Sequence, residues 1–392
     1  MLDTDTINII KATVPAVKAN ADNITACFYP LMFKQHPEVI PFFNQTNQAK
    51  GSQPKALANA VVAYAANIDE LGNLSEAVSK IVQKHCSLDI QPAHYDIVGS
   101  CLLQAIAKVL GDAATPEIID AWGKAYGQLA KILIDAEESI YAGKEQNPGW
   151  WRGEREFTLV KKQQESSVIS SFYFKPSDKG QLPDFTAGQF ISLVLEIKGQ
   201  KVRRNYSLSD APGKGYLRIS VKRESEGLVS NYLHDELALG QSLSLLAPCG
   251  DFVLRDNNKP LVLVTGGVGI TPAISMLNAS TNGEREIRFI HAALNSDAHA
   301  FKDHVDQLAT TRSNLTPLYV YNQPSDNCQA HATGFITPEL IASQLPEDRD
   351  VEFYLLGPKP FMVAAFNIAK QLGVPEGQIH FEFFGPSEEL RA

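Results

Sequence analysis

Over the first 143 residues, apolar side chains recur at spacings of three and four, the repeat that places them on one face of an α-helix. Such segments follow Pro92 and Pro116, and another begins where we expect Asn73 and Ser75 to act as caps. Because no alternation of period two interrupts them, the pattern predicts an all-α domain. Its stripes are Ile24, Phe28, Leu31 and Met32; Leu57, Ala60, Val61, Tyr64 and Ile68; Leu74, Val78, Ile81 and His85; Tyr95, Val98, Leu102 and Ile106; and Trp122, Tyr126, Leu129, Leu133 and Glu137.

The pattern changes after residues 144–151, a segment of Gly, Pro and polar residues without periodicity that is typical of a linker. Residues 152–258 contain five short alternating or apolar runs between Gly, Pro and Ser clusters, which predict an antiparallel β-barrel. Residues 259–392 alternate apolar strands with helical segments, which predicts a parallel sheet covered by helices. We therefore expect a multidomain chain in which residues 1–143 form the first of three domains.

Composition narrows the possible functions. The chain has 392 residues, with 35 Lys and Arg against 44 Asp and Glu, a net charge of -9. This balance argues against nucleic-acid binding, which needs a local excess of cationic side chains. The five cysteines have no zinc-like spacing, so neither a disulfide framework nor a structural zinc site is expected. No signal-peptide pattern and no apolar run of about 18 residues is visible, so we expect a cytoplasmic protein without a transmembrane segment.

Three polar side chains fall on faces that the pattern predicts to be inward: His85, Tyr95 and Glu137. A lone inward histidine is more often a core residue bonded to a backbone carbonyl. Here a phenol and a carboxylate that also need partners are available, and the three groups can satisfy one another. A metal-bound imidazole donates its other N–H to such an acceptor, which makes it a stronger electron donor. On this interpretation His85 is an axial ligand of haem iron, with Tyr95 and Glu137 behind it.

A ligand pocket should face His85. Tyr29 lies beside the Phe28 stripe and could donate a hydrogen bond to a ligand of the iron. Gln53 and Leu57 are one helical turn apart, and Phe43 could pack flat on a macrocycle. Taken singly, each of these residues is as compatible with an ordinary core. Because Pro30 lies inside the same predicted helix as Tyr29, we expect a kink there.

The stretches FYPLMFKQHPEV, QKHCSLDIQPAHYDIVG and DAWGKAYGQLA resemble a globin. The order of parts along the whole chain resembles that of the flavohaemoglobins: a globin, a flavin-binding barrel and a nicotinamide domain. The resemblance implies that His85 is the proximal haem ligand and that Tyr95 and Glu137 are its hydrogen-bonded partners. It also implies that Tyr29, Gln53 and Leu57 line the distal pocket.

In the barrel, the run RRNYSLS resembles the flavin motif of ferredoxin-reductase-like domains. The resemblance implies that Tyr206 packs on the flavin ring, Ser207 bonds to it and Arg204 contacts the pyrophosphate. An exposed strand would also tolerate these residues. The other positions at which the resemblance implies FAD contacts are Asn205, Phe190 and Ser230, together with Phe383, Phe384, Gly385 and Pro386 near the C-terminus.

The third domain opens with LVLVTGGVGITP, in which glycines follow a strand and precede a helix. Glycines let the backbone approach a diphosphate, and a helix N-terminus favours anions. The run is not a full G-x-G-x-x-G, and a simple tight turn is nearly as compatible with it. By resemblance it is the site for NADH or NADPH, formed by Gly267, Val268, Gly269, Ile270, Thr271 and Pro272. Leu356 stands where many relatives have Cys.

The resemblance implies three cofactors: haem b, FAD, and NADH or NADPH as electron donor. The activity that it implies is nitric oxide dioxygenation, in which NO and O2 react at haem iron to give nitrate. One alternative is a reductase that uses the same cofactors on O2, peroxides or ferric compounds. Another is a sensor or store for O2 or NO. The expected partners are the small molecules O2, NO and NAD(P)H, and we expect a monomer that binds no nucleic acid.

Overall fold

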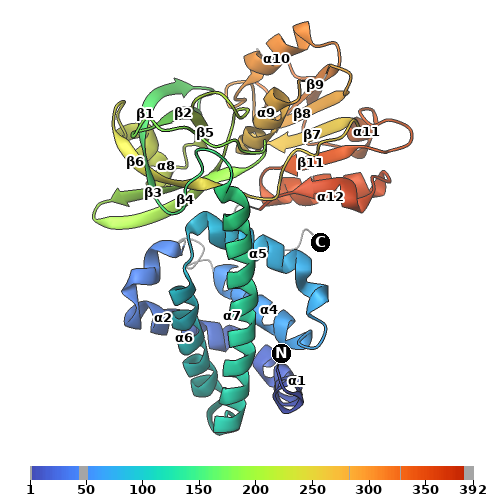
Figure 1. The fold of residues 1–392 in the computed structure, drawn as a ribbon. Helices are drawn as coiled ribbons and strands as arrows, with labels where there is room; N and C mark the ends of the chain where they lie inside the picture. Colours follow the sequence, from blue (N-terminus) through green and yellow to red (C-terminus); the bar gives the residue numbers. More distant parts are fainter. Residues whose placement is uncertain (1, 44–51, 282, 327, 384–392) are drawn as a thin grey trace.

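The computed structural model describes residues 2–43, 52–281, 283–326 and 328–383. Its first part is helical, as the apolar stripes predict, and forms the lower half of the molecule in Figure 1. The core of this part lies between the inward faces of the helices, around Phe28, Met32, Ala105 and Ile106. The helices are α1 (Thr4–Ala19), α2 (Ala21–Gln35), α4 (Ser52–Ala66), α5 (Ser75–Leu88), α6 (Pro92–Leu110) and α7 (Pro116–Glu145), with short 3-10 turns η1 (Pro37–Phe42), η2 (Leu71–Leu74) and η3 (Gly111–Ala113).

Helix boundaries agree with the sequence signals in some places and differ in others. The side chain of Thr115 caps α7 by accepting a hydrogen bond from the amide of Ile118. The predicted caps of α5 are wrong, because its N-cap is Leu74 and no side chain caps it. The preceding turn η2 runs directly into α5, so the chain reaches the helix already coiled. α2 continues through Pro30 to Gln35 as one helix.

The second part is an antiparallel sheet of six strands in the order β4-β3-β6-β1-β2-β5. An antiparallel bridge between Leu208 and Ile219 joins the two outer strands and closes the sheet into a barrel. The sequence pattern did not reveal one strand, β6, although it lies near the centre of the sheet. The strands are β1 (Arg155–Gln164), β2 (Ile169–Pro176), β3 (Phe190–Ile197), β4 (Gln200–Ser207), β5 (Leu217–Lys222) and β6 (Ser242–Cys249), with the short helix α8 (Leu228–Asn231) and the π-helical turn η4 (Tyr232–Glu236) before β6.

The third part is a parallel sheet in the order β10-β9-β8-β7-β11-β12, as the alternation of strands and helices predicts. Its central strand β7 is fully buried, as expected for a sheet covered on both faces. The strands are β7 (Leu261–Gly266), β8 (Ile287–Ala293), β9 (Leu315–Tyr321), β10 (Ala332–Thr333), β11 (Glu352–Leu356) and β12 (Ile379–Phe381). The helices are α9 (Ile270–Ala279), α10 (Lys302–Thr311), α11 (Pro338–Ala342) and α12 (Lys359–Gln371), with 3-10 turns η5 (Gly267–Gly269) and η6 (Glu376–Gln378).

The helical part docks directly on the barrel, and α7 runs from one toward the other (Figure 1). Near the end of α7, the ammonium group of Lys144 donates a 2.7 Å hydrogen bond to the carbonyl of Pro248. At the end of α5, the Ser192 hydroxyl donates to the carbonyl of Ser87, and Asn205 donates to the Ser87 hydroxyl at 3.2 Å. None of the helices in the described ranges has the length and apolar character needed to cross a membrane.

Candidate functional site

Three helices bring His85, Tyr95 and Glu137 together, as the sequence predicts. Nδ1 of His85 lies 2.8 Å from Oε1 of Glu137 and 2.8 Å from the Tyr95 hydroxyl oxygen. The Tyr95 hydroxyl donates to the same Oε1 atom. Tyr126 holds α6 in place by donating a 2.9 Å hydrogen bond to the Tyr95 carbonyl. The three side chains therefore form one connected hydrogen-bond cluster.

This cluster fixes the protonation pattern of the imidazole. Glu137 is only 4% exposed, so its carboxylate needs the donors that surround it. Burial, together with the hydrogen bond to Glu137, raises the pKa of Tyr95, so the phenol stays protonated and donates. With Glu137 accepting, Nδ1 of His85 carries the proton and Nε2 keeps its lone pair. A neutral imidazole with this tautomer is a metal ligand.

The imidazole of His85 opens onto a cavity of about 480 Å³. Its side chain is 29% exposed, so it is less buried than its place on an apolar stripe predicts. The lining is mainly apolar and comes largely from α2, η1, α4, α5, α6 and α7, with a contribution from β4 of the barrel. A large, mainly apolar cavity lined by the His85 imidazole fits a flat hydrophobic macrocycle that carries a metal. The residues present therefore fit haem.

The lining of the cavity contains three of the four predicted distal residues. Tyr29, Leu57 and Phe43 all line the cavity, and the ring centroids of Tyr29 and Phe43 lie 5.8 Å apart in an edge-to-face arrangement. Tyr29 is 6% exposed and also packs edge-on against Phe28. The side chain of Gln53 lies outside the described part of the chain. Flat packing of Phe43 on a macrocycle stays a prediction.

At the predicted flavin site, strand β4 presents Tyr206 and Ser207. The Ser207 hydroxyl is buried, and no described residue offers it a hydrogen-bond partner. Burial raises the pKa of Tyr206, which packs on the barrel core. A buried hydroxyl without a protein partner calls for an external polar group, and a flavin ring supplies one. The site fits FAD at this position.

Unlike Ser207, three other predicted flavin residues have hydrogen-bond partners within the protein. The amide of Asn205 bonds to Ser192 and Ser87, where the barrel meets the helical part. Ser230 accepts a hydrogen bond from the Glu224 amide and donates to the carbonyl of Gly227. Arg204 donates to the carbonyl of Arg203 at 2.8 Å. Phe384, Gly385 and Pro386 lie outside the described residues, whereas Phe383 packs edge-on to Phe381.

Phe190 lies where the barrel meets the helical part. It is 4% exposed and packs in the same cluster as Val82 and Tyr95. Its ring also lies close to the backbone of Gly250, where an added Cβ would be 3.0 Å from it. Flavin contact by Phe190, Arg204, Asn205 and Ser230 stays a prediction.

The glycine run at the end of β7 forms a cradle beside β11. Gly267 has a φ of +53°, which favours glycine, and a Cβ at Gly269 would lie 2.2 Å from the carbonyl oxygen of Leu356. Thr271 is buried and donates to the carbonyl of Val268, which tightens the entry into α9. Bare backbone at the start of a helix fits a nucleotide diphosphate. The cradle thus places the predicted nucleotide residues Val268, Ile270 and Pro272 at the N-terminus of α9.

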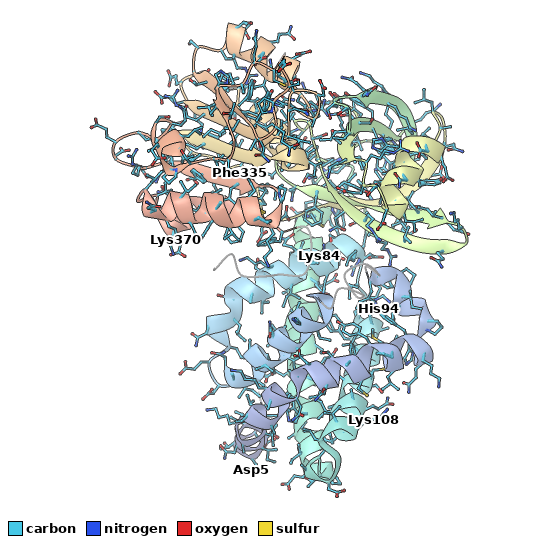
Figure 2. All side chains as sticks on the ribbon, turned by 180° about the vertical axis from the view of Figure 1, so that it is seen from behind. Asp5, Lys84, His94, Lys108, Phe335 and Lys370 are labelled. Atoms are coloured by element: carbon cyan, nitrogen blue, oxygen red, sulfur yellow. The ribbon has the colours of Figure 1, made fainter. Side chains whose placement is uncertain are left out.

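Two charged residues at the junction of the three parts were missed by the sequence reasoning. Lys84 precedes His85 on α5, and burial lowers its pKa (Figure 2). Burial raises the pKa of Glu382 to about 8, and the nearby Lys84 opposes that rise. The sequence signal that could have identified Glu382 is its position as a single carboxylate among the aromatic residues of HFEFF. A third residue, Arg203, stands next to the flavin motif and lines the cavity.

Comparison with known proteins gives matches over the whole chain. Residues 26–133 match the globin family, 156–254 the oxidoreductase FAD-binding domain and 263–366 the oxidoreductase NAD-binding domain. The chain is 53% identical to a flavohemoprotein of Pseudomonas putida over 100% of both chains. It is 46% identical to a flavohemoprotein of Bacillus subtilis over 100% of this chain and 99% of the relative.

Two solved structures are also similar. One is a flavohemoglobin from Malassezia yamatoensis with bound FAD and heme, with a TM-score of 0.86, 29% identity, and coverage of 98% of this chain and 100% of that chain. The other is the FAD/NAD-binding domain of a nitric oxide dioxygenase from Vibrio cholerae, with a TM-score of 0.55 and 32% identity. It covers 59% of this chain and 98% of that chain.

Proposed function

The chain belongs to the flavohaemoglobin family, as its sequence predicts, and we propose that it is a nitric oxide dioxygenase driven by NADH or NADPH. Its FAD- and NAD-binding parts make it an oxidoreductase. When bound, haem supplies the iron at which O2 and NO react to nitrate, and FAD converts the hydride pair of the nicotinamide into single electrons.

The observation that carries the proposal is the 2.8 Å contact between Nδ1 of His85 and Oε1 of Glu137. A buried carboxylate that accepts a hydrogen bond from Nδ1–H gives the imidazole partial imidazolate character, and Nε2 becomes a stronger donor to a metal. Such a ligand favours oxygen activation over reversible storage. The Tyr95 phenol donates to the same oxygen and keeps the carboxylate oriented.

The distal wall would bind and orient the small reactants. Tyr29 lies at the cavity surface, where its hydroxyl can donate a hydrogen bond to a polar ligand. Leu57 and Phe43 restrict water beside it because their side chains offer no hydrogen bonds. A mainly apolar surface beside a phenol donor suits O2 and NO, which are small and weakly polar.

The reductase parts hold the electron-supplying cofactors. We assign Ser207 to the flavin ring, because its buried hydroxyl lacks a partner among the described residues. The cradle of Gly267 and Gly269 would hold the diphosphate of the nicotinamide nucleotide at the start of α9. Both sites belong to the same chain as His85, so electron supply needs no separate reductase protein.

The direct test is aerobic NO consumption by the purified protein with NADH or NADPH, followed with an NO electrode and a nitrate assay. We expect nitrate to form in a one-to-one ratio with the NO consumed. The His85→Ala variant should lose the haem or its axial ligation and, with it, the activity. Absence of nitrate would reject the proposal, and turnover without NO that exceeds turnover with it would favour a reductase acting on O2, peroxides or ferric compounds.

A further inference from the structure

Arg203, on β4 of the barrel, has a buried side chain whose hydrogen bonds are incomplete. The side chain is 7% exposed, and one terminal nitrogen contacts Oε1 of Glu154 at 3.2 Å. The other terminal nitrogen and Nε are buried, and no described residue accepts a hydrogen bond from either. A guanidinium in this state carries a desolvation cost that an acceptor of opposite charge would remove.

The neighbouring charges do not supply that acceptor. Glu154 is shared, because Lys201 contacts the same oxygen at 2.6 Å. The negative charge of Asp89 interacts electrostatically with Arg203 and so reduces the cost of burying the guanidinium. The Asp89 carboxylate, however, accepts its hydrogen bond from the side chain of Gln91, at 2.7 Å. Burial lowers the pKa of Arg203, and the carboxylates of Glu154 and Asp89 only partly oppose this effect. Arg203 is cationic, and two of its nitrogens have N–H groups for which no described residue is an acceptor.

The guanidinium is held in a fixed place by the helical part. Its carbon lies 4.0 Å from the ring centroid of Phe42 in η1, and that ring packs at 4.5 Å on His94 of α6. Figure 2 places His94 where the helical part meets the barrel. A cation–π contact of this kind orients the guanidinium but leaves its in-plane N–H groups unsatisfied.

The side chain of Arg203 borders the cavity onto which His85 opens. Phe42, His94, Arg203 and His85 all line it, with Arg203 contributed by the barrel and the others by the helical part. Haem carries two carboxylates along one edge of an otherwise apolar ring. A guanidinium with Nε and one terminal nitrogen unpartnered among the described residues can donate a charge-assisted hydrogen bond to such a carboxylate.

We propose that Arg203 binds a propionate carboxylate of haem from the barrel side, so that the flavin-binding part completes the haem site. This inference rests on the proposed function only in requiring haem at His85. It goes beyond that function by making haem retention depend on the docking of the two parts. A globin core separated from its barrel would lack this carboxylate partner.

The test is the rate at which haem leaves the full-length protein for excess apomyoglobin, followed by the change in the Soret band. Arg203→Gln should release haem about tenfold faster than wild type, because a charge-assisted hydrogen-bond pair is lost. Arg203→Lys keeps the charge but not the planar guanidinium, so its rate of haem release should fall between those of wild type and Arg203→Gln. The matched control is Arg152→Gln, since Arg152 is also at the junction and pairs with Glu138 away from the cavity.

A second measurement identifies the haem group involved. The full chain is reconstituted with haem or with haem dimethyl ester, which lacks both carboxylates. Wild type should retain haem better than the ester, and Arg203→Gln should lose much of that preference. The resonance Raman propionate-bending band should also shift between wild type and Arg203→Gln.

Equal release rates for wild type and Arg203→Gln would overturn the inference, as would an unchanged preference for haem over its ester. Equal acceleration by Arg203→Gln and Arg152→Gln would overturn it too, because domain docking alone would then explain the result. In all these cases the proposed function would stand if nitrate formation remained intact. Failure of wild type to hold haem would reject both.

Discussion

Oε1 of Glu137 on α7 and Nδ1 of His85 on α5 lie 2.8 Å apart, although 52 residues separate them along the chain. The carboxylate is buried, and the imidazole reaches the cavity with its opposite edge. Each side chain thus stabilises the other: the buried carboxylate gains a hydrogen-bond donor, and the imidazole is held in one tautomer. The same contact gives the proposed chemistry its strongest support.

Replacing Glu137 by Gln should leave haem bound but slow NO consumption by about tenfold or more. The neutral amide is a weaker hydrogen-bond acceptor for Nδ1–H than the carboxylate, so Nε2 becomes a weaker donor to the iron. The iron–histidine stretching band in resonance Raman spectra should move to lower frequency. Glu138→Gln is the matched control, since Glu138 is the exposed neighbour that pairs with Arg152. An unchanged rate in Glu137→Gln would show that the carboxylate does not tune the ligand.

Replacing Tyr29 by Phe should speed the dissociation of O2 from the ferrous protein by about tenfold, because one hydrogen-bond donor in the cavity is removed. Stopped-flow displacement of O2 by carbon monoxide measures this rate. Tyr64→Phe serves as the control, because Tyr64 also lines the cavity but its hydroxyl donates to Gln128 at 3.0 Å. If both variants release O2 at the wild-type rate, Tyr29 is only a packing residue.

Replacing Gly269 by Ala should impair nucleotide binding while leaving FAD in place. The new Cβ would lie 2.2 Å from the backbone oxygen of Leu356, so the cradle must shift. Flavin reduction at low NADH should slow by about tenfold to a hundredfold, the usual effect of a misplacement near 1 Å. Gly377→Ala, where an added Cβ meets nothing within 4 Å, should behave like wild type in the same stopped-flow assay.

The parallel-sheet part should lose stability in mild acid through His299. This ring is 3% exposed, packs on His291 with centroids 4.4 Å apart, and its Nδ1 bonds to the Tyr321 hydroxyl. Burial lowers its pKa from 6.5 to about 3, so below pH 6.5 the unfolded chain binds a proton that the folded chain refuses. Stability is therefore full above pH 6.5 and falls as the pH drops toward 3.

Between pH 7.5 and 5.5 this single group should lower the free energy of unfolding by about 1.4 kcal/mol. Calorimetry, which separates the transitions of the parts, measures the change, and His299→Asn should reduce it. His36→Asn, on the surface of the helical part, is the control. The same pH dependence in wild type and His299→Asn would contradict the assignment.

The sequence predicts those features that depend on local repeats. Helical spacing is enough to place His85, Tyr95 and Glu137 on inward faces, and their unmet hydrogen bonds are enough to group them. Strand β7 is recognisable because all six of its residues are apolar or small. The Ser–Leu alternation of β6 is equally present in the sequence, but it is short and ends in a proline-containing segment, so it was missed.

What the sequence could not show depends on how the parts dock. The hydrogen bond from Asn205 to Ser87 spans 118 residues, and it places an amide expected at the flavin in the joint between two domains. The burial of Arg203 requires Phe42 from another domain to lie on it. His85 is more exposed than its apolar stripe predicts, because the helices leave a cavity where ordinary packing would continue. No local sequence pattern predicts such contacts between domains.

Glu137 and Lys144 stand seven residues apart on α7, two turns of one continuous rod. Glu137 positions the carboxylate behind His85, and Lys144 donates a hydrogen bond to the carbonyl of Pro248 in the barrel. A single residue inserted between them would rotate one of these two contacts by about 100° around the helix axis relative to the other. The length and phase of this helix are therefore as tightly constrained as the side chains that it carries, because the helix sets the position of His85 relative to the barrel.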